Sequence, residues 1–414
     1  MNNKLPENKG VFNKLQSSEG LETKNLPQKN IIFLSLGFAA IFVGFSGAQQ
    51  YITSFFAAEN FVNLGFNTLI ILYLTFALSS PIASVINAKW GAKNSIAIAA
   101  ITYSVFIISL VSSNKILIYL ASIIIGFGAA LLWTGQGAYL VRASEKKHVG
   151  KNAGIFTTFF FLSSAIGIFL LGQIIKFYSY KVAFIIAAII PLLGLLLFSQ
   201  MYNFKTKAKV QNKFKLVKKA IQNKTAIKLS TIWFSQSFVF GLSLGLIPLA
   251  TTKLLGTSFV SYLMPLFYVI PIALGYIIGK TMDNKGIGKI LYLSYATAIL
   301  ALIALFISSK SLLIIGIVLL ALSFASMRIV TLALPASVTD DNNLEYLQGL
   351  FWLVQNIGTV TALLLSKFIQ SNFAFLIALI ILIITLIIIL KTFKMDFSKQ
   401  KFEEIKITLS KQIK

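Results

Sequence analysis

Twelve apolar stretches fill almost the whole chain between residues 30 and 394, and each is long enough to cross a bilayer. A hydrocarbon core of roughly 30 Å requires about 20 apolar residues of helix. Helices are expected because lipid offers backbone groups no hydrogen-bond partner. The sequence therefore predicts an all-α membrane protein. The expected spans are 31–56, 66–88, 95–112, 116–141, 153–175, 182–201, 229–252, 258–279, 290–309, 311–335, 346–366 and 372–390.

The basic residues alternate between the two sides of the predicted membrane. The gaps on the side of both termini hold 30 lysines and arginines, the opposite gaps hold six, and one arginine lies inside a span. Loops rich in Lys and Arg stay in the cytoplasm, so both termini are expected there, in a multi-pass protein of the plasma membrane. Membrane topology thus explains the net charge of +25, and nucleic-acid binding is not expected.

The longest internal break divides the twelve spans into six and six. This arrangement predicts two six-helix bundles, 31–201 and 229–393, joined by a basic cytoplasmic linker, 202–228. A polar cytoplasmic tail, 1–30, precedes the first bundle, and a basic cytoplasmic tail, 394–414, follows the second. The composition of the first tail favours disorder.

Two basic segments also carry apolar residues at helical spacing. In the linker these residues are Phe214, Val217 and Ile221. This pattern fits either an amphipathic helix on the inner leaflet or a plain solvated loop. A similar stripe in the last tail consists of Phe402, Ile405 and Leu409.

Polar side chains vary among the spans with a period of three. Spans 1, 4, 7, 10 and 11 carry Gln, Asn, Arg or Trp, whereas spans 3, 6, 9 and 12 carry no Gln, Asn, Asp, Glu or Arg well inside the membrane. A helix that faces lipid can be uniformly apolar, whereas one that lines a cavity need not be. We therefore expect spans 3, 6, 9 and 12 to form an outer shell. Spans 1, 4, 7 and 10 are expected to line a central cavity between the two halves.

Glycine and proline mark local geometry in the second half. Gly241 with Gly245, and Gly275 with Gly279, have the spacing that permits close helix packing. Pro265 and Pro271 are expected to kink span 8, because proline removes a backbone donor.

Several kinds of chemistry are not expected. The chain has no cysteine, its one histidine lies in a loop, and no Asp or Glu lies deep in a span. These features predict no metal site, no cofactor and no catalytic constellation, so the protein is not expected to be an enzyme. Proton coupling through buried carboxylates is disfavoured for the same reason.

The pattern Trp-x-x-Gln occurs in three spans. Residues spaced i to i+3 share a helix face, and the glutamines lie roughly 8–15 Å from the basic helix ends at 1.5 Å per residue. A common depth predicts one solute site shared by both halves. Alternatively, each glutamine forms a hydrogen bond between helices, worth ~0.6 kcal/mol. Each tryptophan would then anchor its helix at the membrane–water interface. The candidate residues are Arg328, Gln136, Trp133, Tyr139, Gln49, Gln50, Trp233, Gln236, Trp352, Gln355 and Asn356.

Arg328 is the one charge well inside a span. The chain uses lysine for 35 of its 37 basic residues, and its other arginine is Arg142. An arginine at depth suggests a need for a permanently charged, forked donor. Arg328 would then bind a solute that is anionic or bears a carbonyl group. Alternatively, it extends to the inner interface or pairs with Asp340 or Asp341.

Two loops resemble each other in the two halves. The segment GKTMDNKG at 279–286 fits the pattern G-x-x-x-D-x-x-G, and SVINAKWG at 84–91 keeps only the last glycine, which is followed by Lys93. With the six-plus-six arrangement, this resembles the major facilitator superfamily. The resemblance implies a cytoplasmic gating contact by Asp283. The implied gating residues are Gly279, Asp283, Gly286, Gly91 and Lys93.

Three further stretches resemble the Unc-ninety-three-like branch of that superfamily. They are LYLTFALSSPIASVINAKWGAKNSI at 72–96, GFGAALLWTGQGAYL at 126–140 and GIFTTFFFLSSAIG at 154–167. The resemblance implies one of two functions. The first is a secondary transporter that moves a small solute by alternating access. The second is a non-transporting regulatory or trafficking partner of an ion channel or another membrane protein.

Overall fold

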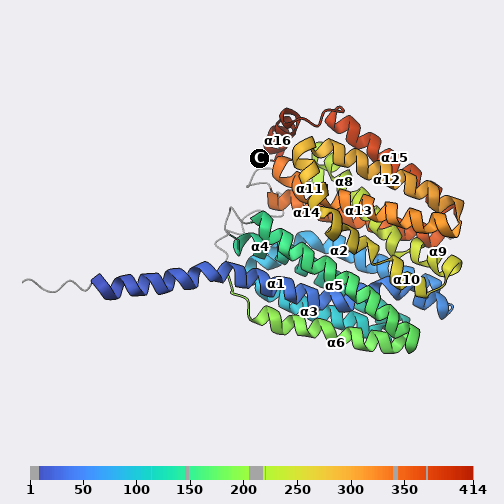
Figure 1. Ribbon diagram of the computed structural model, residues 1–414, viewed down its shortest axis with the longest axis horizontal. Helices are drawn as coiled ribbons and strands as arrows, with labels where there is room; N and C mark the ends of the chain where they lie inside the picture. Colours follow the sequence, from blue (N-terminus) through green and yellow to red (C-terminus); the bar gives the residue numbers. More distant parts are fainter. Residues whose placement is uncertain are drawn as a thin grey trace, which may run out of the picture.

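Two helical bundles lie side by side in the computed structural model (Figure 1). It describes residues 9–112, 114–144, 149–204, 218–219, 221–338, 344–369 and 372–413. Within these residues there are helices and no strands, and twelve segments are long and apolar enough to cross a membrane. The predicted all-α membrane architecture of two six-helix bundles is confirmed.

The helices of each half follow one another along the chain. The first bundle contains α1 (Lys9–Ala58), α2 (Val62–Trp90), α3 (Ala92–Ser109), α4 (Lys115–Arg142), α5 (Val149–Phe177) and α6 (Tyr180–Ser199). The second contains α8 (Lys224–Leu244), α9 (Leu246–Leu255), α10 (Ser258–Leu263), α11 (Leu266–Lys285), α12 (Ile287–Ile307), α13 (Lys310–Val338), α14 (Leu344–Phe368) and α15 (Phe373–Phe393). A last helix, α16 (Lys399–Ile413), follows the second bundle.

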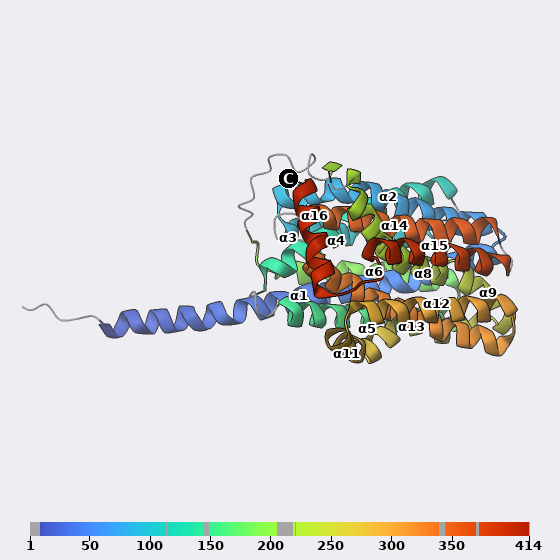
Figure 2. The same cartoon turned by 90° about the horizontal axis from the view of Figure 1, so that it is seen from above.

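The first helix is much longer than its membrane span. Helix α1 runs for 50 residues from Lys9, so the prediction of a disordered tail is wrong from that residue onward. The unfavourable step in helix formation is the first turn. Extending an existing helix avoids that step, and each added residue gains one backbone hydrogen bond. Figure 2 shows this extension projecting away from the bundles, at the end of the molecule where α16 also lies. We call this end the basic end.

Spans 7 and 8 are each built from two helices. The backbone leaves helical geometry at Gly245 (φ −106°, ψ −84°), which separates α8 from α9. Helix α10 ends at Leu263, and α11 begins directly after Pro265. The kink predicted at Pro265 is therefore confirmed, whereas Pro271 lies inside α11. The break at Gly245 was not predicted from the sequence.

The two glycine pairs differ in packing. A Cβ added at Gly241 would lie 2.7 Å from the Cβ of Ala362, and one added at Gly245 would lie 2.8 Å from the Oγ of Ser366. Both glycines thus let α8 approach α14 closely, as predicted. The same prediction is wrong for Gly275 and Gly279, where no described neighbouring atom lies within 4 Å of an added Cβ.

Helices α6, α12 and α15 form much of the outer surface. Each exposes large aliphatic side chains, such as Leu196, Leu300 and Ile384. This exposure fits helices in contact with lipid, where apolar surface carries no penalty.

The predicted stripe of the last tail covers the second bundle. Phe402, Ile405 and Leu409 are buried on one face of α16. The ring of Phe402 lies 5.3 Å from that of Phe393 at the end of α15. In the linker, Phe214 and Val217 lie outside the described residues, so the prediction of an amphipathic helix stays a prediction.

Candidate functional site

A cavity of about 90 Å³ lies between the two bundles. Five helices of the first bundle line it (α1 to α5), and so do α8, α11, α13 and α14 of the second. Its polar non-aromatic lining consists of Ser46, Gln49, Gln236, Ser237, Arg328, Gln355, Asn356 and Thr359. Its aromatic lining consists of Phe42, Phe45, Tyr73, Phe76, Tyr103, Trp133, Phe160, Phe161, Phe240, Tyr268, Phe324 and Trp352.

One face of α1 and one face of α14 supply eight of these residues. On α1 they are Phe42, Phe45, Ser46 and Gln49, and on α14 they are Trp352, Gln355, Asn356 and Thr359. Both sets follow the spacing i, i+3, i+4, i+7 that defines one side of a helix. The periodicity of the sequence therefore places each set along the cavity.

Seven of the eleven residues that the sequence predicted for a solute site line this cavity. They are Arg328, Trp133, Gln49, Gln236, Trp352, Gln355 and Asn356. Of the three Trp-x-x-Gln pairs, only the pair on α14 contributes both members. A solute-binding role for the seven residues stays a prediction.

The other four predicted residues lie elsewhere. The Tyr139 hydroxyl donates to the Asn30 side chain (3.0 Å) and contacts the Tyr202 carbonyl (2.9 Å), which ties helix ends together. Trp233 stacks on Phe351, with ring centroids 3.8 Å apart. The two remaining residues are Gln50, which donates to the Ser243 carbonyl oxygen at 2.7 Å, and Gln136, which is half-buried outside the cavity lining.

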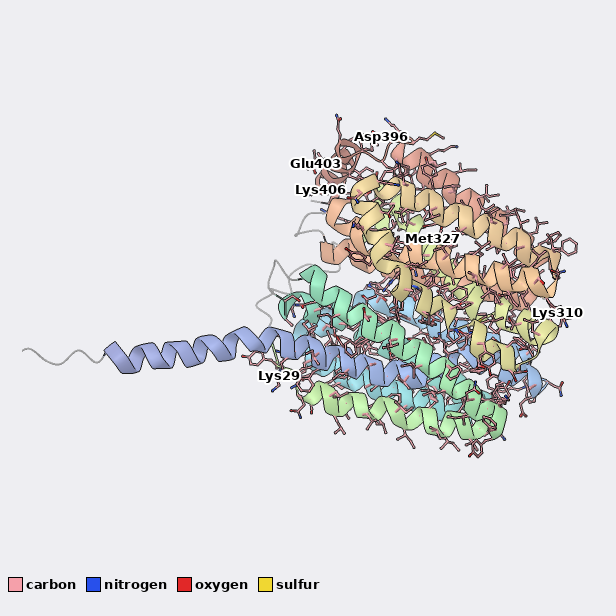
Figure 3. The ribbon with its side chains drawn as sticks, in the orientation of Figure 1. Lys29, Lys310, Met327, Asp396, Glu403 and Lys406 are labelled. Atoms are coloured by element: carbon pink, nitrogen blue, oxygen red, sulfur yellow. The ribbon has the colours of Figure 1, made fainter. Side chains whose placement is uncertain are left out.

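Arg328 is the one charged residue in the described part of the cavity lining. It follows the buried Met327, which Figure 3 places between the ends marked by Lys29 and Lys310. Its guanidinium has no hydrogen bond, ion pair or ring contact with any residue that the structure describes. Asp340 and Asp341, its alternative partners in the sequence, lie outside the described residues. The Arg328 side chain is half-buried, and an unpaired charge away from water is costly, so the site favours an anion beside the guanidinium.

The amide side chains of the same lining differ in their hydrogen bonds. Within the described part of the chain, the Oε1 atom of Gln236 is buried without a partner. The Asn356 side chain donates back to the Trp352 carbonyl oxygen, at 2.8 Å. Across the cavity, Gln49 donates to the Tyr73 hydroxyl. Together these groups can orient a polar solute.

Contacts between the bundles lie on both sides of the cavity. Toward the basic end, the rings of Trp133 and Trp352 are 5.6 Å apart, and Phe76 stacks on Trp352 at 5.8 Å. Toward the opposite end, Gln50 and Thr53 of α1 donate to carbonyl oxygens at the end of α8, at 2.7 and 3.2 Å. The cavity is thus bordered by an aromatic contact on one side and by hydrogen bonds on the other.

The two loops that resemble each other have the same geometry. Gly91 (φ 87°, ψ 139°) and Gly286 (φ 86°, ψ 157°) each form the single residue between two helices. Lys93 donates to the Ser199 carbonyl oxygen at 2.8 Å, at the end of α6. The side chain of Asp283 lies outside the described residues, so its gating role stays a prediction.

Three tyrosines and three hydroxyl residues of the lining were not predicted from the sequence; the hydroxyl residues are Ser46, Ser237 and Thr359. Tyr73, Tyr103 and Tyr268 line the cavity from α2, α3 and α11. The assignment of spans 1, 4, 7 and 10 to the lining was therefore too narrow, because α2, α5, α11 and α14 also contribute. Tyr103 is an exception to the outer-shell role expected of span 3. A tyrosine inside an otherwise apolar span was the signal that could have found the three tyrosines.

Comparison with known proteins gives one extended sequence match. A sequence profile of the Major Facilitator Superfamily matches residues 30–362. UNC93-like protein MFSD11 of Xenopus tropicalis is 34% identical over 130 residues, covering 31% of this chain and 29% of that relative. Protein unc-93 homolog A of Bos taurus is 31% identical over 148 residues, covering 34% and 32%. The matches thus span about a third or less of these curated relatives.

Solved transporter structures share the fold at low sequence identity. The xylose transporter XylE of E. coli, partially occluded and inward open, aligns with a TM-score of 0.65 at 13% identity, over 88% of this chain and 99% of XylE. A bacterial homologue of the human drug peptide transporters aligns with a TM-score of 0.68 at 12% identity, over 89% of this chain and 100% of its own. These similarities concern the fold alone.

Proposed function

This chain belongs to the major facilitator superfamily and resembles its UNC93-like members, and we propose that it is a secondary transporter of a small solute. The supporting observation is a cavity whose polar lining comes from both bundles. In secondary transporters, two repeats rock about a central site and expose it to each side in turn. The cavity between these bundles has the position that such a mechanism requires.

Alternating access requires that the two borders of the cavity open at different times. The aromatic contact between Trp133 and Trp352 is the proposed gate toward the basic end. The hydrogen bonds from Gln50 and Thr53 to α8 are the proposed gate toward the opposite end. Asp283, in the turn before Gly286, is proposed to stabilise the closed state of the first gate.

The proposed solute site centres on Arg328. Its guanidinium supplies charge, and the amides of Gln236, Gln355, Asn356 and Gln49 supply orientation. An anionic or carbonyl-bearing solute matches a forked cationic donor. No catalytic step and no cofactor is part of the proposal.

The excess of basic residues at the end of the molecule that carries both termini supports an orientation. We place this end in the cytoplasm, because Lys and Arg in short loops are retained on that side. The proposed location is the plasma membrane.

The second candidate function is a non-transporting regulatory or trafficking partner of an ion channel or another membrane protein. The sequence similarity to UNC93-like relatives leaves it open, since it covers about a third or less of their length. Purified protein would first be screened for solutes that raise its melting temperature. Stabilising solutes would then be tested for uptake or exchange in liposomes. Accumulation or exchange supports the transporter, whereas stable copurification of a channel without uptake of any solute class supports the partner.

A further inference from the structure

We propose that the cavity binds a compact organic monoanion, with a single carboxylate-type group at Arg328 and an apolar, planar or branched body against the aromatic walls. This inference rests on the proposed function, since it names the solute class of that site. It specifies both the charge and the shape of the solute.

The charge of the lining sets the charge of the ligand. Among the lining residues that the structure describes, Arg328 is the one that is charged, and its guanidinium has no partner among the described residues. None of these described lining residues is a carboxylate that could neutralise it. A ligand with one negative charge leaves the occupied cavity neutral, whereas a dianion would leave one charge uncompensated away from water. A neutral ligand would leave the arginine unpaired.

The walls of the cavity set the shape of the ligand. Twelve of the 22 lining residues are aromatic, and they come from both bundles. Tyr103 and Phe45 have ring centroids 4.8 Å apart, and Phe42 and Phe160 are 4.7 Å apart. Phe42 and Phe45 lie 5.8 Å apart and join the two pairs into a continuous surface. Aromatic surfaces of this kind favour stacked or edge-on contact with a planar or branched apolar group.

The size of the cavity limits the ligand further. Its volume of about 90 Å³ lies below the ~300–1,000 Å³ of pockets that hold drug-sized ligands. The amides of Gln236, Gln355 and Asn356 lie in the same lining as the guanidinium. The lining therefore offers the acidic group a charged donor and amide N–H donors, and a single ring or short branched chain fills the rest.

The test measures binding to purified protein by calorimetry and by the rise in melting temperature. The probes are benzoate, phenylacetate and isovalerate, and each is compared with its neutral alcohol. Acetate is the control for an anion that lacks a ring or branched apolar group, and isophthalate is the control for a dianion. At least one of the three probes should bind about tenfold or more tightly than its alcohol, since hydrogen bonds to charged groups are the stronger kind. Acetate and isophthalate should bind more weakly than that probe.

Three variants assign the preference to Arg328. Arg328→Gln should abolish the preference for the anion over the alcohol. Arg328→Lys should reduce it, because lysine keeps the charge and loses the forked geometry. Arg142→Gln removes the other arginine of the chain, which lies outside the cavity lining, and should leave the preference unchanged.

A labelling measurement keeps the test decisive if Arg328→Gln does not fold. The native chain has no cysteine, so Ser237→Cys places a single thiol in the cavity lining. The preferred anion should slow alkylation of this thiol in protein that retains Arg328, and its alcohol should not. Equal protection by anion and alcohol, or no binding of any of the three anions, would overturn the proposal.

Transport assays separate this inference from the proposed function. Binding of the anion without uptake or exchange in liposomes would overturn the proposed transport function but would support the proposed anion site. Uptake of neutral solutes, with no anion preference and no effect of Arg328→Gln, would support the proposed transport function and overturn the proposed anion site.

Discussion

Trp133 of α4 and Trp352 of α14 meet across the boundary between the two bundles, with ring centroids 5.6 Å apart and an interplanar angle of 38°. Both rings line the central cavity on the side of the basic end. Phe38 and Phe42 of α1 each lie 5.4 Å from Trp133, so one side of the contact is held by its own bundle. We therefore expect opening of the cavity toward the basic end to separate these two tryptophans.

Replacing Trp352 with alanine should open the cavity toward the basic end. The substitution removes the ring that contacts both Trp133 and Phe76, so the aromatic contact between the bundles is lost. In a chain with Ser237→Cys as its one thiol, alkylation by a membrane-impermeant maleimide in nanodiscs should become several-fold faster. Trp233→Ala is the matched control, because Trp233 stacks on Phe351 within the second bundle. If both variants accelerate labelling equally, the effect is general loosening and the gate is misassigned.

Loss of the Gln50 hydrogen bond should favour opening at the opposite end. Gln50→Leu removes its bond to the Ser243 carbonyl oxygen, which joins the two bundles. Hydrogen bonds between membrane helices average ~0.6 kcal/mol, so the open population should rise about threefold. Spin labels at Glu59, directly after α1, and at Ser258, the first residue of α10, would report a larger fraction of long distances. Gln136→Leu is the control, and an equal shift in that variant would contradict the prediction.

Gly91 and Gly286 should resist substitution because of their backbone conformation. Both have φ near +87° with an extended ψ, a region that is essentially restricted to glycine. Alanine at either position should cost about 1–3 kcal/mol of folding free energy and lower the melting temperature. Gly279→Ala should instead keep or raise the melting temperature, because its site is helical and open and alanine is the better helix former by about 1 kcal/mol. A lower melting temperature in Gly279→Ala than in Gly286→Ala would contradict this account.

Hydropathy and charge alternation were sufficient to predict the spans and their division into two bundles. Within a span, however, hydropathy separates protein-facing from lipid-facing sides poorly, because both surfaces are apolar. Trp233 illustrates the problem. Its spacing from Gln236 predicted a shared helix face and a shared site, yet its ring packs on Phe351 while Gln236 lines the cavity.

Rare residue types were more informative than periodicity for the candidate site. Arg328 stood out because the chain uses lysine almost everywhere else, and it lies in the cavity lining. Tyr73 and Tyr103 were missed because a tyrosine in a span is compatible with either packing or a cavity. For Gly275 and Gly279, close packing was predicted but is not found. The same spacing occurs both in glycines that pack closely and in glycines that have no close neighbour.

The apolar face of α16 should hold this helix on the second bundle. Ile405 is buried on that face, so Ile405→Asp would place a carboxylate among apolar groups and release the helix. Amide hydrogen exchange across residues 399–413 should become several-fold faster, while α15 stays protected. Ile407 is exposed on the same helix, and Ile407→Asp should leave the exchange rate unchanged. Equal acceleration in both variants would indicate that helix propensity, and not packing, governs this segment.

Acid should loosen the start of α16. The Asp396 carboxylate accepts hydrogen bonds from the backbone N–H and hydroxyl of Ser398 (2.8 and 3.1 Å), and this lowers its pKa below the ordinary value. Lys401 donates to the Glu404 carboxylate at 2.7 Å and lowers the pKa of that group as well. Because both pKa values are depressed in the folded state, the stabilisation is present above the ordinary values of 3.8 and 4.5 and is lost as the pH falls through the lower folded values.

This pH dependence can be measured by hydrogen exchange in α16 between pH 6 and about pH 3. The native chain is compared at each pH with Asp396→Asn/Glu404→Gln, because this pairing cancels the intrinsic pH dependence of exchange. Protection in the native chain should exceed that of the double variant at pH 6, and the difference should decrease toward the acid end. A difference that stays constant over the whole range would show that the two carboxylates do not stabilise the helix through their charge.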